Sequence, residues 1–226
     1  FTKEFEKDCY NISIIGAEVN KSLINFSSFY EPKTCVNEKN SFREFHAIQS
    51  GGRMKFFDEK NLLLTTGEFR YRTLAQKDDE IFGKVLKINA EDKSVKIIAK
   101  GLRNSQGLFF DDLNNLIFLT DHGPAGGDEI NVIDLNKNKI ENFGWPISSY
   151  GEHYHRKKHP ERYNEAPLHK SHSKYGFKEP IKYFKKSIGI SEIVKVNNSF
   201  FEKQDDNIRL LVSALGDNLK EGDMSL

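Results

Sequence analysis

The sequence has no excess of charge of either sign and no long apolar run. Its 226 residues include 34 Lys and Arg against 33 Asp and Glu, which gives a formal net charge of +1. A surface this balanced has no field that would concentrate a polyanion, so we expect no nucleic acid partner. A membrane-spanning helix needs about 18 consecutive apolar residues, whereas the apolar stretches are short pieces such as Leu62-Leu63-Leu64. The sequence therefore predicts no membrane segment.

Cysteine is scarce and an initiating methionine is missing. Cys9 and Cys35 are the only cysteines, and they are compatible with one disulfide in an oxidising compartment or with two unrelated buried thiols. The chain begins at Phe1 without an apolar signal core, so we expect a processed product or part of a longer protein. No segment has convincing helical periodicity, and this lack favours an all-β protein.

A pair of hairpins recurs along the chain. Lys55-Phe56-Phe57-Asp58 reappears as Leu108-Phe109-Phe110-Asp111, about 50 residues later, and each copy leads through a polar turn into a short apolar run. Those runs, residues 62–66 and 116–120, have the length and branching of buried strands. Both copies are therefore predicted to be antiparallel hairpins.

A second type of hairpin alternates with the first. Val85-Leu86-Lys87-Ile88-Asn89 is predicted to turn into residues 95–98, and residues 130–134 to turn through 136–139 into Ile140. Two hairpins in each unit make a four-stranded sheet, and a period of about 50 residues is typical of propeller blades, which bury their faces against their neighbours. A two-sheet sandwich is the alternative.

The remaining chain is divided by one long polar stretch. Residues 151–178 are too polar and turn-rich for core strands, so we expect a long loop between strands, of a kind that often covers a site. Strands are predicted again at residues 190–196 and 208–213. We expect residues 1–226 to form a single, partial β-propeller domain.

Several short motifs follow one another in an order that resembles a known family. They are Gly51-Gly52-Arg53-Met54, Gly83-Lys84-Val85-Leu86, Leu102-Arg103-Asn104-Ser105-Gln106-Gly107-Leu108, Gly123-Pro124 through Asp128-Glu129-Ile130-Asn131, and Asn142-Phe143-Gly144-Trp145-Pro146. Together they resemble the soluble quinoprotein glucose, aldose-sugar and sorbosone dehydrogenases. The resemblance implies an all-β, six-bladed β-propeller, of which this chain supplies about four blades.

The resemblance also implies a cofactor site. In that family pyrroloquinoline quinone (PQQ) lies at the top of the propeller, held by Ca²⁺ and by Arg and Asn side chains, a pair that Arg103 and Asn104 match. A guanidinium suits quinone oxygens and their developing charge. Gly123 and Pro124 match two residues whose backbone carbonyls bind the calcium ion, and Asp128 adds negative charge nearby. Thr120-Asp121-His122-Gly123-Pro124 is the best candidate for the site.

Two positions depart from the family pattern. His122 stands where the glucose enzymes have glutamine, and an imidazole can still hydrogen-bond or move protons there. The family's general base is a histidine four residues before the Arg of the Gly-Arg pair, and this position is Gln49, which cannot take a proton at neutral pH. His46 is three residues away from it, and in a strand this odd shift would turn His46 to the opposite face.

The long loop is rich in histidine. It contains His153, His155, His159, His169 and His172, but their spacing fits no closed pattern of four metal ligands, so we expect a solvated loop without a metal.

Two functions remain open from the sequence. The first is a periplasmic or secreted oxidoreductase that oxidises a sugar, such as an aldose, or a related alcohol at PQQ and passes electrons to an external acceptor; Arg103, His122 and position 49 would act in catalysis. The second is a propeller that binds a glycan or a protein and has lost catalysis, which Gln49 favours. A calcium-dependent lactonase on a similar propeller would need carboxylates and an Asn converging on one metal, and no such set is evident.

Overall fold

The regular secondary structure of the described residues consists almost entirely of β-strands. The computed structural model describes residues 1–19, 23–154, 161–196, 200 and 207–216. Within these residues, no helix has the length and apolar character needed to cross a membrane. The strands are β1 (Thr2–Glu6), β2 (Cys9–Ile12), β3 (Ile14–Val19), β4 (Ile24–Tyr30), β5 (Val36–Asn37), β6 (Gly51–Phe56), β7 (Asn61–Thr66), β8 (Lys84–Asn89), β9 (Val95–Lys100), β10 (Ser105–Asp111), β11 (Leu116–Asp121), β12 (Asp128–Asp134), β13 (Glu141–Asn142), β14 (Lys182–Phe184), β15 (Ile190–Val196) and β16 (Arg209–Ala214).

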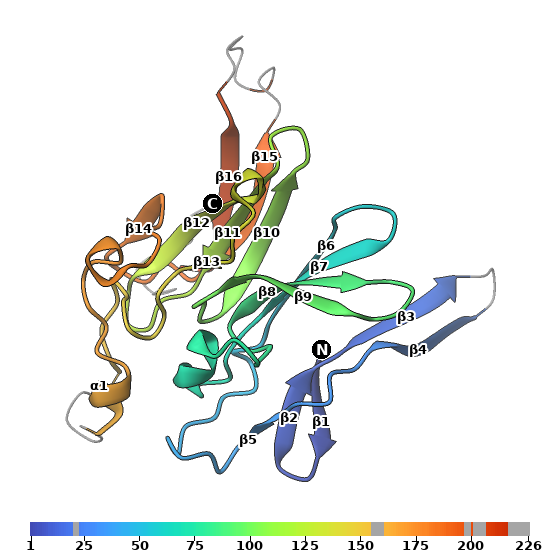
Figure 1. Ribbon diagram of the computed structural model, residues 1–226, viewed down its shortest axis with the longest axis horizontal. Coiled ribbons are helices and arrows are strands. Elements are labelled where there is room, and N and C mark those ends of the chain that lie inside the picture. The colour runs from blue at the N-terminus through green and yellow to red at the C-terminus, as the bar shows by residue number, and fades with distance from the viewer. Residues whose placement is uncertain (20–22, 155–160, 197–199, 201–206, 217–226) are drawn as a thin grey trace.

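Short helical turns connect some of these strands (Figure 1). They are the 3₁₀ turns η1 (Arg72–Gln76), η2 (Leu135–Lys137) and η3 (Ser173–Tyr175) and the α-helix α1 (Glu161–Glu165). Among the described residues of the predicted loop at 151–178 there are only α1 and η3 and no named strand. The described part of this stretch therefore consists of turns and short helices.

Two sheets have the arrangement of propeller blades. One is a meander of β6, β7, β8 and β9, to which β13 adds as a fifth strand, and the other has the order β10-β11-β12-β14. Strand β10 lies beside both β6 and β15, so the first strands of successive sheets are neighbours (Figure 1). Strands β15 and β16 pair antiparallel in the next sheet, while β1-β2-β5 and β3-β4 form the N-terminal sheets.

One of the predicted hairpins is wrong. Residues 130–134 belong to β12, but the chain then leaves the sheet through η2, and β13 pairs in parallel with β9 of the preceding sheet. Phe143 and Trp145 follow β13 and are buried, with Phe143 in the core between the two sheets. Burial of these two rings draws the chain across, and β14, from far along the sequence, becomes the neighbour of β12.

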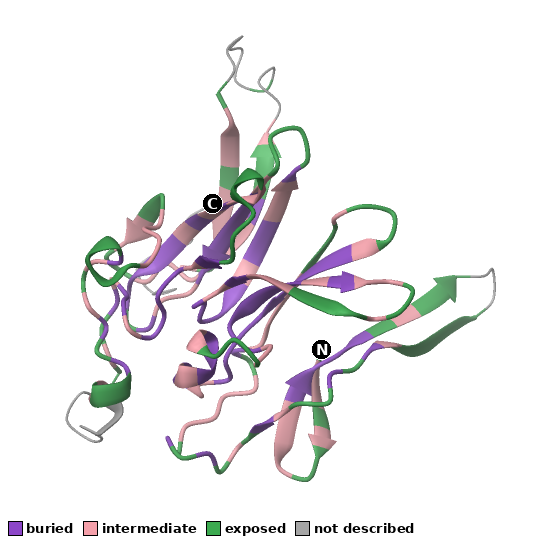
Figure 2. Ribbon diagram, viewed as in Figure 1, coloured by how far each residue is buried: buried purple, intermediate pink, exposed green. Residues whose placement is uncertain are grey.

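The core consists of layers between sheets, as the alternation of side chains in a strand requires. In β7, Leu63 faces a cluster that contains Ile117 and Leu119 of β11, whereas Leu62 and Leu64 face a cluster with Ile12 of β2. Figure 2 shows the buried residues concentrated in the strands of the two large sheets. Strand β7 is thus buried on both faces, which explains its continuous apolar sequence.

Equivalent threonines connect neighbouring sheets. Thr65 at the end of β7 donates a hydrogen bond from Oγ1 to Ser105 O of β10 at 2.8 Å. Thr120 at the end of β11 donates in the same way to Ser191 O of β15. The repeated Phe57 and Phe110 stack with ring centroids 4.8 Å apart. The internal repeat seen in the sequence is therefore a repeat of contacts between sheets.

Two further sequence features acquire a place in the fold. Arg53 of the Gly-Gly-Arg motif joins three inner strands, because its Nε donates to Gln106 O at 2.9 Å and its Nη1 lies 2.7 Å from Glu192 Oε2. Cys9 and Cys35 form a disulfide with a Cα–Cα distance of 5.4 Å. The disulfide joins β2 to the residue before its partner strand β5, so the first of the two readings of the cysteines is confirmed.

Lys84, in the Gly83-Lys84 motif, is fully buried. Its ammonium group donates hydrogen bonds to Leu74 O at 2.8 Å, Ala75 O at 3.0 Å and Phe82 O at 2.7 Å. Three acceptors match the three protons of an ammonium group. Lys84, the first residue of β8, thus holds η1 against that strand.

Replacing Lys84 should therefore destabilise the protein. We expect Lys84→Met to lower the free energy of unfolding by about 3 kcal/mol, since three buried carbonyls lose their donor and an unsatisfied buried group costs about 1–3 kcal/mol. The exposed Lys96 of the same sheet gives the matched control, Lys96→Met, with an expected change within about 0.5 kcal/mol. Urea denaturation measures both, and equal stabilities for the two variants would contradict this role.

Candidate functional site

The turn between β9 and β10 carries Arg103 and Asn104, and the carboxylate of Asp121 fixes it. Asp121 Oδ2 accepts a hydrogen bond from Arg103 N at 2.9 Å, and Oδ1 accepts from Asn104 N at 2.7 Å and from Ser105 Oγ at 3.0 Å. Burial raises the pKa of Asp121 to about 6, and the N–H groups of Arg103 and Asn104 oppose this rise. Asp121 lies at the end of a buried strand, where it acts as a template for the turn.

The side chains of Arg103 and Asn104 reach in different directions. Arg103 Nη1 donates hydrogen bonds to His122 O at 3.1 Å and Gly123 O at 2.8 Å, and the guanidinium carbon lies 5.4 Å from the centroid of the Trp145 ring. Asn104 Oδ1 accepts a hydrogen bond from Gly51 N at 3.0 Å. The pair therefore connects the start of β6 with the loop after β11.

The loop after β11 is held from inside by Asp128. Oδ1 of this fully buried residue accepts from Gly123 N at 3.0 Å, and Oδ2 accepts from Ile188 N at 3.0 Å and Ile190 N at 3.2 Å. A side chain at position 123 would collide with the backbone of Gly126 and Gly127, so glycine is needed there. Asp128 thus shapes the loop through backbone N–H groups.

Carbonyl oxygens of this loop converge on a positive charge. The carbonyls of His122 and Gly123 both accept from the Arg103 guanidinium. Hard oxygen donors that face one cation have the chemistry that a calcium ion requires.

Burial lowers the pKa of His122, with Asp128 raising it and Arg103 lowering it further. Pro124 is buried beside Gly151. The described residues contain no cluster of three or more His, Cys, Asp or Glu that could hold a metal, so side-chain ligands of that kind are not grouped there.

Gln49 lies next to the same turn. Its backbone carbonyl accepts a hydrogen bond from Phe69 N at 3.0 Å. The residue before Phe69, Glu68, donates from its N–H to Arg103 O at 3.2 Å. Gln49 is 7% exposed and its Oε1 is buried without a hydrogen-bond partner. The structure therefore brings positions 49, 103, 104, 122 and 123 together, and Asp128 supports them from behind.

Glu68 is a residue of this site that the sequence analysis missed. It is fully buried, and neither carboxyl oxygen has a hydrogen-bond partner. Burial raises its pKa to about 8, although the charges of Arg103 and Arg72 lower it. The next two residues, Phe69 and Arg70, both have left-handed backbone angles, with φ of 53° and 68°. Consecutive non-glycine residues of this kind are strained and cluster at functional sites.

In the sequence, Glu68 is recognisable only as a polar residue after the apolar run of β7. Glu68 lies two residues after the end of β7 and Asp121 is the last residue of β11, so an acidic residue at or just after the end of a buried strand was the available signal. Strand periodicity says nothing about what surrounds that residue. Only the packing of Arg70, Arg72 and Arg103 around Glu68 distinguishes it from a solvated acid.

The described histidines of the long loop have separate partners. The His153 ring lies against that of Tyr163 with centroids 4.2 Å apart and planes tilted by 57°, and His169 stacks on Tyr175 at 3.8 Å. His172 Nε2 lies 3.3 Å from Glu129 Oε1. His155 and His159 lie outside the described residues. Burial works against the charge of His172, but Glu129 raises its pKa overall. The expectation of a solvated loop is wrong for His172, which is buried against β12.

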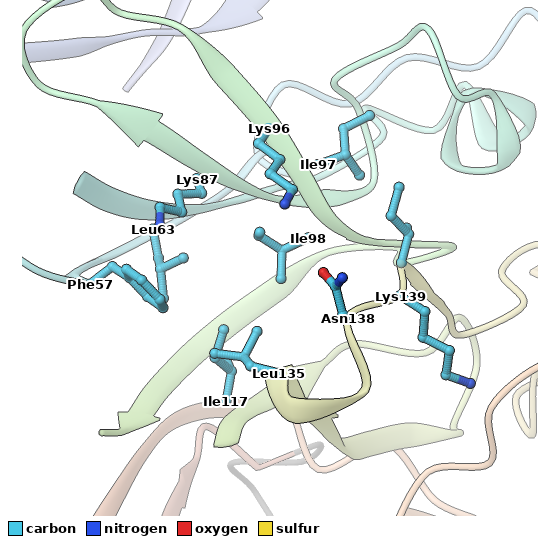
Figure 3. Close-up of a pocket in the computed structure, with 11 residues that line it drawn as sticks. Phe57, Leu63, Lys87, Lys96, Ile97, Ile98, Ile117, Leu135, Asn138 and Lys139 are labelled. Carbon is cyan, nitrogen blue, oxygen red and sulfur yellow. The ribbon is translucent and has the colours of Figure 1, made fainter. Parts of the chain in front are cut away.

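A hollow elsewhere in the molecule has no connection with these residues. It has a volume of about 230 Å³ and lies between the two large sheets and η2, with Ile98 and Asn138 among its lining residues. Figure 3 shows Asn138 pointing towards Ile98, while Lys139 points away. None of the candidate site residues lines this hollow.

Comparisons with known proteins agree with the arrangement of the strands. The profile of the glucose / sorbosone dehydrogenase family matches residues 18–220. The aldose sugar dehydrogenase of Escherichia coli is 29% identical over 180 residues, which are 74% of this chain and 45% of that protein. An uncharacterised protein of Borreliella burgdorferi is 30% identical over 169 residues, 70% of this chain and 40% of its own length. The chain therefore spans less than half of the length of these curated relatives.

Solved structures with a similar fold include two sugar dehydrogenases. The soluble aldose sugar dehydrogenase of Escherichia coli in its apo form has a TM-score of 0.70 and 25% identity, over 95% of this chain and 60% of that chain. The PQQ-bound aldose sugar dehydrogenase of Streptomyces coelicolor has a TM-score of 0.54 and 21% identity, over 81% of this chain and 49% of that chain. The fold is thus that of the six-bladed propeller, of which this chain covers about 60%.

The buried carboxyl of Glu68 predicts a distinctive dependence of stability on pH. Its pKa of about 8 in the folded protein exceeds the ordinary value of 4.5, so folding favours the protonated carboxyl. The contribution of this group to the free energy of unfolding is complete below pH 4.5 and is lost as the pH rises towards 8. The slope is about 1.4 kcal/mol per pH unit. Glu68→Gln, which does not titrate, should become progressively more stable than wild type between about pH 5 and pH 8.

The exposed Glu59 provides the control for this prediction. Urea unfolding of wild type, Glu68→Gln and Glu59→Gln across that pH range measures the effect. A difference between wild type and Glu68→Gln that stays constant with pH would show that the Glu68 carboxyl ionises normally.

Proposed function

Because the chain belongs to the glucose / sorbosone dehydrogenase family, we propose that it forms the cofactor site of a PQQ-dependent oxidoreductase that oxidises an aldose or a related alcohol. The observation that carries this proposal is the Arg103 guanidinium, which meets the carbonyl oxygens of His122 and Gly123, with Asn104 beside it bound to Gly51 N. A PQQ-bound relative with the same fold supports it. An external electron acceptor completes the proposed reaction.

Each residue of the site has a proposed task. Arg103 and Asn104 hold the quinone, whose chemistry when bound is to accept hydride from C1 of the sugar. The guanidinium supplies fork-shaped donors and a fixed positive charge. The carbonyls of Gly123 and Pro124 bind the calcium ion in this proposal. The carbonyls of His122 and Gly123, which accept hydrogen bonds from the Arg103 guanidinium, support it, because they are oxygen donors of the same loop beside a positive charge.

The two acidic residues have supporting tasks in this proposal. Asp128 contributes negative charge close to the calcium ion, and its carboxylate holds Gly123 in place through the N–H of that residue. Asp121 orients Arg103 and Asn104 through their backbone N–H groups. His122 faces the same loop, and its lowered pKa keeps the imidazole neutral, so it can hydrogen-bond to a sugar hydroxyl.

The disulfide supports an extracytoplasmic place for the protein. Disulfides persist in oxidising compartments such as the periplasm and the extracellular medium, and Cys9 and Cys35 are bonded. We therefore propose that the protein is periplasmic or secreted.

A second candidate is a propeller that binds a glycan or a protein without catalysis. Gln49 favours it, since an amide cannot accept a proton at neutral pH, and the unpartnered Oε1 of Gln49 offers an acceptor for a ligand hydroxyl. This candidate predicts binding of a sugar without turnover. Gln49→His then tests whether catalysis is one residue away.

Titration of the complete protein with PQQ in the presence of Ca²⁺ tests the first proposal. We expect quinone binding, followed by the absorbance change of the reduced quinone when an aldose is added. Arg103→Met should weaken quinone binding by about 10- to 100-fold, because it removes charge-assisted hydrogen bonds. Arg43→Met, at an exposed arginine, serves as the control with affinity unchanged. Absence of turnover across a panel of aldoses, with quinone bound, would reject the oxidoreductase in favour of the binding protein.

A further inference from the structure

The segment before β6 is a turn, and this changes where His46 lies. Gln49 N donates to His46 O at 3.0 Å, which closes a four-residue turn, and strand β6 begins only at Gly51. In a strand, a shift of three residues would send His46 to the face opposite Gln49. This does not hold here because residues 46–49 are not in a strand, so side chains three apart need not lie on opposite faces.

A single residue clamps both ends of this turn. Phe69 N donates to Gln49 O at 3.0 Å, and Phe69 O accepts from His46 N at 3.0 Å. The ring of Phe45 stacks on that of Phe69 with centroids 5.9 Å apart and nearly parallel planes, 6° from one another. Position 46 is thus as firmly placed against the strained residues 69 and 70 as position 49.

The His46 imidazole has an unused ring nitrogen. Nδ1 is buried and has no hydrogen-bond partner, although the residue as a whole is partly exposed. Buried polar atoms without a partner are rare in folded proteins, and an unfilled ligand site is one reason for them. Gln49 Oε1, at the other end of the turn, is in the same condition.

The groups around His46 favour its neutral form. Burial lowers the pKa of the imidazole, and the charges of Arg70 and Arg103 lower it further. Arg103 is also the residue whose guanidinium faces His122 O and Gly123 O. Glu68 lies on the segment that leads into Phe69, and burial raises its pKa to about 8, so this acid is largely protonated at neutral pH. A neutral imidazole is what a proton acceptor at pH 7 needs.

We propose that His46 is the proton acceptor of the site, in place of the histidine that is missing at position 49. The inference rests on the proposed function. As the sugar is oxidised, the hydroxyl O–H bond at C1 breaks and its proton passes to a ring nitrogen of His46, the C1–H bond breaks with its electron pair going as hydride to the quinone, and C1 becomes a carbonyl. Gln49 accepts a hydrogen bond from the sugar and orients it, without taking a proton.

Steady-state kinetics of His46→Gln in the complete protein, loaded with PQQ and Ca²⁺, tests this role. We expect kcat to fall about 100- to 10,000-fold, with quinone affinity unchanged within about twofold, and the fall of kcat towards acid pH, where His46 becomes protonated, to disappear. His169→Gln, on the long loop, is the matched control with unchanged kcat. The double variant His46→Gln/Gln49→His should regain at least about tenfold of the lost kcat, because it returns an imidazole to the other end of the turn.

An NMR titration of the histidines gives a readout that needs no cofactor. His46 should titrate below its ordinary pKa of 6.5, and Arg103→Met should raise that pKa. A His46→Gln protein that binds quinone and retains kcat within about threefold of wild type would overturn the inference and leave the oxidoreductase in place, as would a His46 that titrates at or above 6.5. Failure of wild type to bind quinone overturns the proposed function itself. If His46→Gln does not fold, His46→Asn and the titration of wild type decide the question.

Discussion

The large sheets of this protein depend on their neighbours to cover their faces. Strand β7 has Leu63 in one core layer and Leu62 and Leu64 in another, so its sheet has apolar side chains on both faces and would expose one of them if it stood alone. Packing between sheets brings the first strands β6, β10 and β15 side by side. At Gly107 of β10, a side chain would collide with Ser191 O of β15, which shows how closely these strands approach.

That close approach determines where the site is built. Loops at one end of the inner strands meet: the turn before β6 supplies His46 and Gln49, the turn before β10 supplies Arg103 and Asn104, and the loop after β11 supplies Gly123. Their connections are mainly hydrogen bonds to backbone atoms, such as those from Glu68 N to Arg103 O and from Phe69 N to Gln49 O. A site assembled in this way keeps its side-chain atoms available, and the unpartnered Oε1 of Gln49 and Nδ1 of His46 are examples.

Buried charge is handled in different ways across the molecule. Lys84 gives all three protons to carbonyls, and Asp128 receives three backbone N–H groups; both hold loops in place. Glu68 has no such partners and is instead surrounded by arginine charges. Lys84 holds η1 and Asp128 holds the site loop from behind, whereas the unsatisfied acid Glu68 lies beside the turn of Arg103 within the candidate site. This contrast associates Glu68 with function. Burying an unpaired acid lowers the stability of the protein, and a purely structural role does not require that cost.

The sequence by itself determined several of the strands and the family. The recurring Phe-Phe-Asp segments and the apolar runs predicted the hairpins β6-β7 and β10-β11, because alternation and turn chemistry are local properties of the chain, and the ordered motifs predicted Arg103, Asn104 and Gly123 as site residues. Only the tertiary structure decided that β14 rather than residue 140 completes the second sheet, since that choice depends on burying Phe143 between the two sheets and Trp145 against Ala75 and Leu168. It also decided the surroundings of Glu68 and the place of His46. Their protonation depends on arginines and backbone groups that are distant along the chain, and a linear pattern contains no information about which distant groups will face each other.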